Sequence, residues 1–114
     1  MTVKDGYAEK MYTIFLDNNN RLLCANKISD DIENKVSVSK DVIVCKMLEY
    51  NAEKVLLVHD HRQDGTPSIE DIELTLQIKA AIEQFDSELA EHIIILDDCR
   101  QRSVLKYIKE HFGG

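Results

Sequence analysis

Two histidines and an aspartate are the residues of this chain best suited to chemistry. They stand in the segment VLLVHDHRQDGTPSIEDIELT, residues 55–75, as His59, His61 and Asp71. Imidazole nitrogens and carboxylate oxygens are donors that bind zinc, and three of them leave a fourth tetrahedral position for water. Water bound there has its pKa lowered to about 7 and becomes a nucleophile. A catalytic metal site is therefore one interpretation of this segment.

A strand would have to position the two histidines. KVLLVHD, residues 54–60, is a nearly continuous apolar run, which is typical of a strand buried on both faces. Side chains alternate along a strand, so residues two apart point the same way. His59 and His61 therefore share a face if the strand persists through Asp60.

A helix would have to supply the third donor. SIEDIELTLQIKAAIEQF, residues 68–85, predicts a helix with Ser68 as its N-cap and acids in its first turn. Asp71 then lies one turn inside the helix, where a short loop would bring it over the end of the strand. The alternative is that Asp71 only completes a capping box with Ser68, and that the histidines merely end a strand.

The rest of the chain continues the alternation of strands and helices. Further strands are predicted over residues 10–17, 21–29 and 92–97, and further helices over 39–50 and 102–112. The first two strands form a hairpin across the turn DNNN. The order β, β, α, β, α, β, α predicts an α/β fold, with a mixed β-sheet flanked by helices in one domain, residues 1–114.

The helix over residues 39–50 is predicted from a capping residue and from the spacing of apolar side chains. Ser37 or Ser39 is the expected N-cap. Apolar side chains that recur at roughly helical spacing predict the helix itself: Val42, Cys45, Met47, Leu48 and Tyr50.

Composition narrows the class of protein. The net charge is −7 and no run of Lys or Arg exceeds two residues, so no nucleic-acid partner is expected. The three cysteines show no C-x-x-C spacing, which favours a reducing cytoplasm over a disulfide framework. Apolar runs are too short to span a membrane, so a soluble cytoplasmic protein is expected.

The segment around the histidines resembles the JAMM/MPN signature, H-x-H followed by Ser-x-x-Asp, in its RadC-like form. HDH at residues 59–61 and TPSIEDIELT at residues 66–75 carry the likeness. YTIFLDNNNRLL, LEYNAEKVLLVHDH and LAEHIIIL resemble the flanking elements of RadC-like proteins. The resemblance implies a JAB/MPN, cytidine-deaminase-like architecture, a zinc ion and cleavage of a peptide or isopeptide amide in a protein substrate.

The resemblance also implies a role for each site residue. His59, His61 and Asp71 would be the zinc ligands. Ser68 would stabilise the tetrahedral intermediate, and Glu9, eight residues before Asp17, would be the general base. RadC-like proteins carry a helix-hairpin-helix segment before this region, and this sequence starts after it, so the resemblance implies no DNA-binding role.

The sequence departs from the RadC-like pattern at three points, of which Arg62 and a shortened loop favour a second hypothesis. Arg62 replaces the usual Pro, and its positive charge would oppose a bound cation. The interval from His61 to Asp71 is one residue shorter than usual, and the C-terminal segment after Asp97 does not match the family's closing strand. The alternative function is a degenerate, metal-free RadC-like domain that acts as a protein-interaction module.

Two further expectations concern His92 and the helix over residues 68–85. His92 is expected to be structural, hydrogen-bonded at the start of a strand, with a role in orienting a metal ligand as the alternative. The helix carries apolar residues on more than one face, which favours a possible homodimer.

Overall fold

The computed structural model describes residues 10–28, 35–62 and 66–112 of the chain. Glu9 lies outside these residues. The backbones of His61 and Arg62 are described, but their side chains are not.

The centre of the fold is a five-stranded sheet with the order β2-β1-β3-β4-β5. Its strands are β1 (Lys10–Leu16), β2 (Leu22–Ile28), β3 (Lys54–Arg62), β4 (Glu88–Leu96) and β5 (Gln101–Ser103). β1 runs antiparallel to both β2 and β3, β3 runs parallel to β4, and β4 runs antiparallel to β5. The predicted fold class, a mixed sheet flanked by helices, is confirmed.

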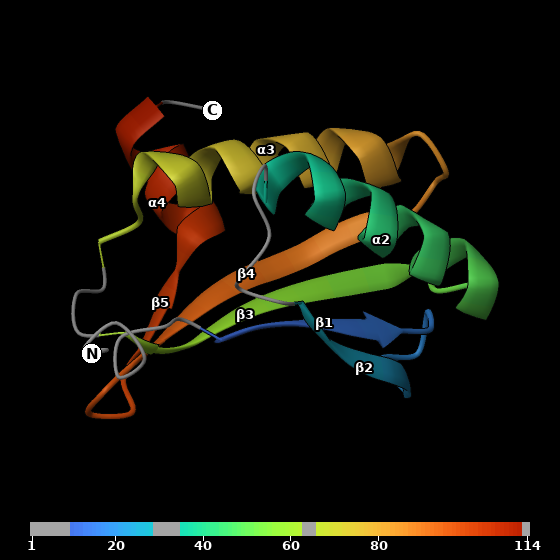
Figure 1. Cartoon of the computed structure of the whole chain (residues 1–114), viewed down its shortest axis with the longest axis horizontal. Helices are drawn as coiled ribbons and strands as arrows, with labels where there is room; N and C mark the ends of the chain where they lie inside the picture. Colours follow the sequence, from blue (N-terminus) through green and yellow to red (C-terminus); the bar gives the residue numbers. More distant parts are fainter. Residues whose placement is uncertain (1–9, 29–34, 63–65, 113–114) are drawn as a thin grey trace.

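The described helices pack on one face of this sheet. They are α2 (Lys35–Tyr50), α3 (Ile69–Glu83) and α4 (Val104–Phe112), and Figure 1 shows all three on the same side. α3 contacts β4 and lies between α2 and α4, with contacts to each. The first turn of α3 thereby comes to rest above the sheet.

The core fills the layer between the sheet and the helices. Alternate residues of β3, namely Val55, Leu57 and His59, are buried beneath α2 and α3, as alternation along a strand requires. Leu56 and Val58 point to the other face and are only half-buried. The prediction that β3 is buried on both faces is therefore wrong, because the described helices cover one face only.

The opening hairpin is confirmed, and its turn has a clear local cause. The Asp17 carboxylate accepts hydrogen bonds from the backbone N–H groups of Asn19 and Arg21. Asn20 has φ of 63°, a left-handed conformation that Asn tolerates better than most residues. The Asp-Asn sequence therefore reverses the chain between β1 and β2.

The predicted start of α2 is wrong, whereas its predicted end at Tyr50 is confirmed. The helix begins at Lys35, so Ser37 and Ser39 lie inside it and neither is the N-cap. Among residues 40–50 of this helix, whose side chains are described, Ile43 and Met47 are fully buried, whereas Leu48 is 49% exposed. Val42, Cys45 and Tyr50 are exposed as well. Ile43 and Met47 therefore form a buried stripe of i, i+4 spacing, and the half-buried Val44 packs against the same core.

The C-terminal part differs from prediction at two points. β4 begins at Glu88, so His92 lies at the centre of the strand and not at its start. The chain then turns at Cys99, which has φ of 71°, and returns as β5 before α4 begins at Val104. A strand of three residues is too short to show alternation in a sequence. The predicted helix over residues 102–112 therefore included most of β5.

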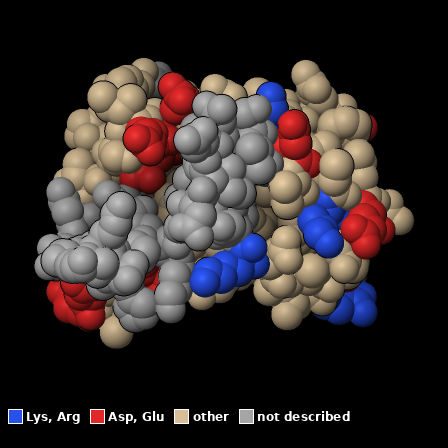
Figure 2. Space-filling model, viewed as in Figure 1, with Lys and Arg blue, Asp and Glu red and all other residues tan. Residues whose placement is uncertain are grey.

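No helix in the described part of the chain is long and apolar enough to cross a membrane. Figure 2 shows Lys and Arg side chains lying apart from one another, among Asp and Glu, on the face in view.

Candidate functional site

The candidate site lies where β3 passes beneath the first turn of α3. His59 comes from β3 and is 1% exposed, and Asp71 comes from α3 and is 5% exposed. His59 points toward the helices because it shares the buried face of β3 with Val55 and Leu57. The fold therefore brings together two of the three predicted metal ligands.

The two carboxylate oxygens of Asp71 contact different partners, one at the N-terminus of α3 and the other on His59. Its Oδ2 accepts the backbone N–H of Ser68 at 2.8 Å, and its own backbone N–H donates to Ser68 Oγ at 3.0 Å. Its Oδ1 lies 3.5 Å from His59 Nδ1. The predicted capping box is confirmed, and it holds the carboxylate in place beside the imidazole without using both oxygens.

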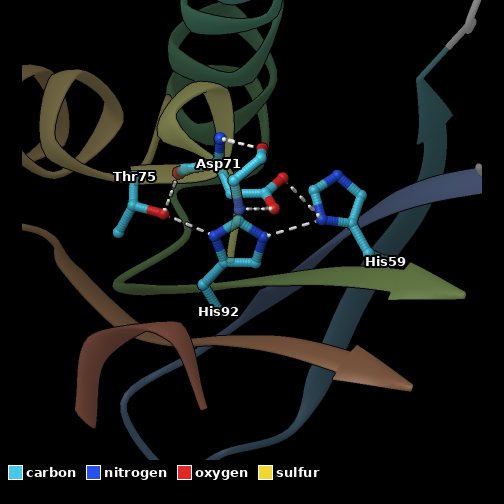
Figure 3. Close-up of polar contacts among 5 residues, drawn as sticks. His59, Asp71, Thr75 and His92 are labelled. Carbon is cyan, nitrogen blue, oxygen red and sulfur yellow. Dashed lines mark hydrogen bonds and ion pairs between the residues drawn. The ribbon is translucent and has the colours of Figure 1, made fainter. Parts of the chain in front are cut away.

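A second histidine completes this buried cluster. His92, on the adjacent strand β4, is fully buried, and its Nε2 lies 3.1 Å from His59 Nδ1 (Figure 3). The two rings are tilted, with centroids 4.9 Å apart. His92 extends from the sheet toward α3, and its register partner on β3 is the core residue Leu57, two residues before His59.

Thr75 connects this pair of imidazoles to α3. Its hydroxyl oxygen lies 2.5 Å from His92 Nδ1, and the hydroxyl donates to the backbone carbonyl of Asp71 at 2.7 Å. In Figure 3, contacts link Thr75 to His92 and His92 to His59, beneath Asp71. Thr75 was not among the predicted site residues. The available signal was its position four residues after Asp71, which places both on one face of a helix.

The structure places the other predicted residues less completely. The backbone of β3 continues through His61 to Arg62, so the strand does persist through Asp60, although its pairing with β4 becomes irregular after His59. β1 begins at Lys10, opposite Asp60 on β3. Glu9 and the side chain of His61 lie outside the description, so their predicted roles stay predictions.

The donors described here fit zinc in type. One imidazole and one carboxylate, both nearly buried, adjoin at the junction of β3 and α3, and zinc accepts nitrogen and oxygen ligands of these kinds. No group of three His, Cys, Asp or Glu side chains is arranged to hold a metal ion among the residues that the structure describes. A third ligand would therefore have to come from a side chain outside the described part, and the sequence predicts His61 for this position.

The sheet order and the His–Asp pair at the end of a central strand correspond to the JAB class of α/β domains. A sequence model of the RadC-like JAB domain matches residues 1–107. The chain belongs to the RadC-like JAB domain family, as its H-x-H and Ser-x-x-Asp motifs predicted.

Curated relatives of the chain include several bacterial UPF0758 proteins. One from Fusobacterium nucleatum is 38% identical over 95 residues, which cover 81% of this chain and 41% of the relative. One from Pelobacter propionicus is 33% identical over 96 residues, covering 83% of this chain and 42% of the relative. A third, from Photobacterium profundum, is 30% identical over 96 residues, covering 83% and 43%. The chain thus spans about two-fifths of the length of these relatives.

Proposed function

We propose that this chain is a zinc-dependent metallohydrolase of the JAMM type that cleaves a peptide or isopeptide amide. The observation that carries the proposal is the buried approach of Asp71 Oδ1 to His59 Nδ1 at 3.5 Å, between two different elements of the fold. A carboxylate beside an imidazole, held by a capping box at the end of a central strand, supplies two metal donors on rigid supports.

In this proposal His59, His61 and Asp71 hold the zinc ion. When bound, zinc would polarise the scissile carbonyl and lower the pKa of water. Two hydrogen bonds with Ser68 hold Asp71 at the start of α3, and one of them fixes its carboxylate. The β3 backbone, paired on both sides, fixes the position of His59.

Glu9 and Ser68 have the catalytic roles. Glu9 accepts a proton from the attacking water and later delivers it to the leaving amine, as a general base and then a general acid. Ser68 Oγ is an acceptor in the capping box, so the hydroxyl keeps its own proton for donation. Ser68 lies at the exposed N-terminus of α3, where that proton supports the negative oxygen of the tetrahedral intermediate.

Metal analysis of the chain purified without chelator tests the proposal. We expect about one zinc per chain, and loss of zinc in the double variant His59→Ala with Asp71→Ala. A matched control is His111→Ala with Asp98→Ala, which removes an exposed histidine and an exposed aspartate and should leave the zinc content unchanged. Circular dichroism of each variant reports whether the fold is retained.

The same experiment decides between the enzyme and the metal-free interaction module. Folded wild-type protein without zinc, even after incubation with excess zinc salt, supports the module and contradicts the enzyme. Arg62→Gln tests the main departure from the family pattern, because removing the positive charge that follows His61 in the sequence should tighten zinc binding.

A cleavage assay tests the chemistry itself. The probes are fluorogenic peptides with α-linked amides and matched peptides linked through a lysine ε-amide. Cleavage that is lost in a chelator and restored by zinc would support a metal-dependent amidase. Zinc-loaded protein that cleaves neither type of linkage would contradict it.

A further inference from the structure

We propose that Thr75 and His92 are positioning residues, which hold His59 in the tautomer that carries its proton on Nδ1 and its lone pair on Nε2. The consequence for metal binding depends on the proposed function, but the tautomer is a property of the protein alone. The inference starts from three buried polar side chains, each at most 1% exposed: His59, Thr75 and His92.

The direction of the hydrogen bonds follows from the single proton of the Thr75 hydroxyl. This hydroxyl donates to the Asp71 carbonyl at 2.7 Å, the i−4 bond that Thr commonly makes inside a helix. Toward His92 Nδ1 the same oxygen can then only accept, so His92 Nδ1 carries a hydrogen. A neutral imidazole protonated on Nδ1 has its lone pair on Nε2.

The same assignment of protons to hydrogen bonds extends to His59. His92 Nε2 lies 3.1 Å from His59 Nδ1, and it is the acceptor of the two. His59 Nδ1 must therefore donate, which leaves the lone pair of the neutral ring on Nε2. Metal-binding histidines are held in this manner when the other ring nitrogen donates to a fixed acceptor.

The opposite direction is disfavoured by the helix. If Thr75 donated to His92, its oxygen would lie 2.7 Å from the Asp71 carbonyl with no proton between the two acceptors. His92 Nε2 would then donate to His59 Nδ1, and His59 would be protonated on Nε2 and unable to bind a metal through it. Unsatisfied groups in a buried site are costly, so the first direction is favoured.

In this arrangement one turn of α3 positions both proposed metal donors, the carboxylate of Asp71 and the imidazole of His59. Asp71 is the ligand residue at the start of that turn, and its carbonyl is the acceptor for Thr75 at the end. Thr75 then orients His92, and His92 orients His59. The carboxylate and the imidazole are therefore positioned through the same segment of α3, residues 71–75.

Nuclear magnetic resonance of the metal-free full chain tests the inference directly. Long-range ¹H–¹⁵N correlation at mildly alkaline pH, where an unperturbed imidazole is neutral, distinguishes a protonated ring nitrogen from an unprotonated one. We expect His59 and His92 to be protonated on Nδ1, with signals assigned through His61→Gln and His111→Gln variants. His59 protonated on Nε2 in the wild-type protein would overturn the inference without any change at Thr75.

Two variants at Thr75 separate positioning from packing. Thr75→Val keeps the shape of the side chain but removes the hydroxyl, so His59 should become a mixture of tautomers. Thr75→Ser removes a methyl group but keeps the hydroxyl, so it should retain the wild-type tautomer. A single Nδ1–H tautomer in folded Thr75→Val would contradict the role of the hydroxyl.

Zinc affinity provides the second readout. Competition with a chromophoric chelator should show about tenfold weaker binding in Thr75→Val and affinity close to the wild type's in Thr75→Ser. Equal affinity in all three proteins would overturn the link between the network and the metal. A wild-type protein that binds no zinc would instead refute the proposed function, while the tautomer measurement would still decide the network.

Discussion

Ser68 and Asp71 hold each other through two reciprocal hydrogen bonds, one from each backbone N–H to the side chain of the other residue. The pair closes the N-terminus of α3 and directs Asp71 Oδ1 toward His59. Capping and ligand placement are therefore one arrangement, and the two interpretations of the Ser-x-x-Asp motif do not exclude each other. Substitution of each partner should separate the two consequences.

Asp71→Asn should lose zinc with little change in stability. Asparagine keeps an oxygen that can accept the Ser68 N–H, but it lacks the negative charge that a divalent cation requires. Ser68→Ala should do the reverse, with zinc retained and the free energy of unfolding lowered by about 1 kcal/mol through loss of the N-cap. Zinc content and urea unfolding measure both variants. Asp71→Asn that retains full zinc would show that the carboxylate is only a cap.

Glu9→Gln should abolish amide cleavage while retaining the metal. The amide side chain cannot accept the proton from water at neutral pH, and in our proposal Glu9 is not a ligand. Turnover and zinc content are measured on the same preparation. Glu70→Gln, a change at an exposed acid in the first turn of α3, is the control and should remain active. Release of zinc from Glu9→Gln would make Glu9 a ligand and contradict its role as a base.

Met47→Ala should destabilise the domain far more than Leu48→Ala. Met47 is 1% exposed and packs in the core beneath α2, whereas its neighbour Leu48 is 49% exposed. Deletion of a buried side chain of this size costs about 2–5 kcal/mol, because the lost contacts are only partly replaced. Urea unfolding should therefore give a much lower midpoint for Met47→Ala. Similar losses for the two variants would show that the outward face of α2 is also covered.

Asp17 should make the stability of the opening hairpin depend on pH. The backbone N–H of Arg21, and then that of Asn19, hold the pKa of the Asp17 carboxyl below its usual range. A lowered pKa in the folded state stabilises the fold above the pKa of the unfolded carboxyl, and this contribution is lost as pH falls through the folded pKa. The difference in melting temperature between the wild type and Asp17→Ala should therefore narrow below about pH 4. A difference that stays constant through the acid range would contradict this assignment.

The sequence was most informative where local chemistry decides the structure. Asp17 followed by asparagines predicted the first turn, and Ser68 with Asp71 predicted the start of α3, because both depend on hydrogen bonds within a few residues. The family motif predicted the approach of His59 to Asp71, which spacing alone left open.

The errors arose where tertiary packing decides the structure. The helical spacing in α2 marked Met47 but not Ile43, because tertiary packing decides which apolar residues of a helix meet the sheet. His92 was placed at a strand start, but its bonds to His59 and Thr75 join residues 33 and 17 positions away in the chain. No local pattern encodes such contacts, so only the helix spacing of Thr75 from Asp71 pointed toward them.

β3 is the third of five strands, with β1 bonded along one edge and β4 along the other. β3 can leave the sheet only if its backbone hydrogen bonds to both β1 and β4 break. Its backbone amides should therefore be among the slowest of the domain to exchange with deuterium. Opening of the segment that carries His59 then coincides with unfolding of the domain. A ligand captured by that histidine would raise the melting temperature of the entire domain, and its removal by a chelator would lower the same transition.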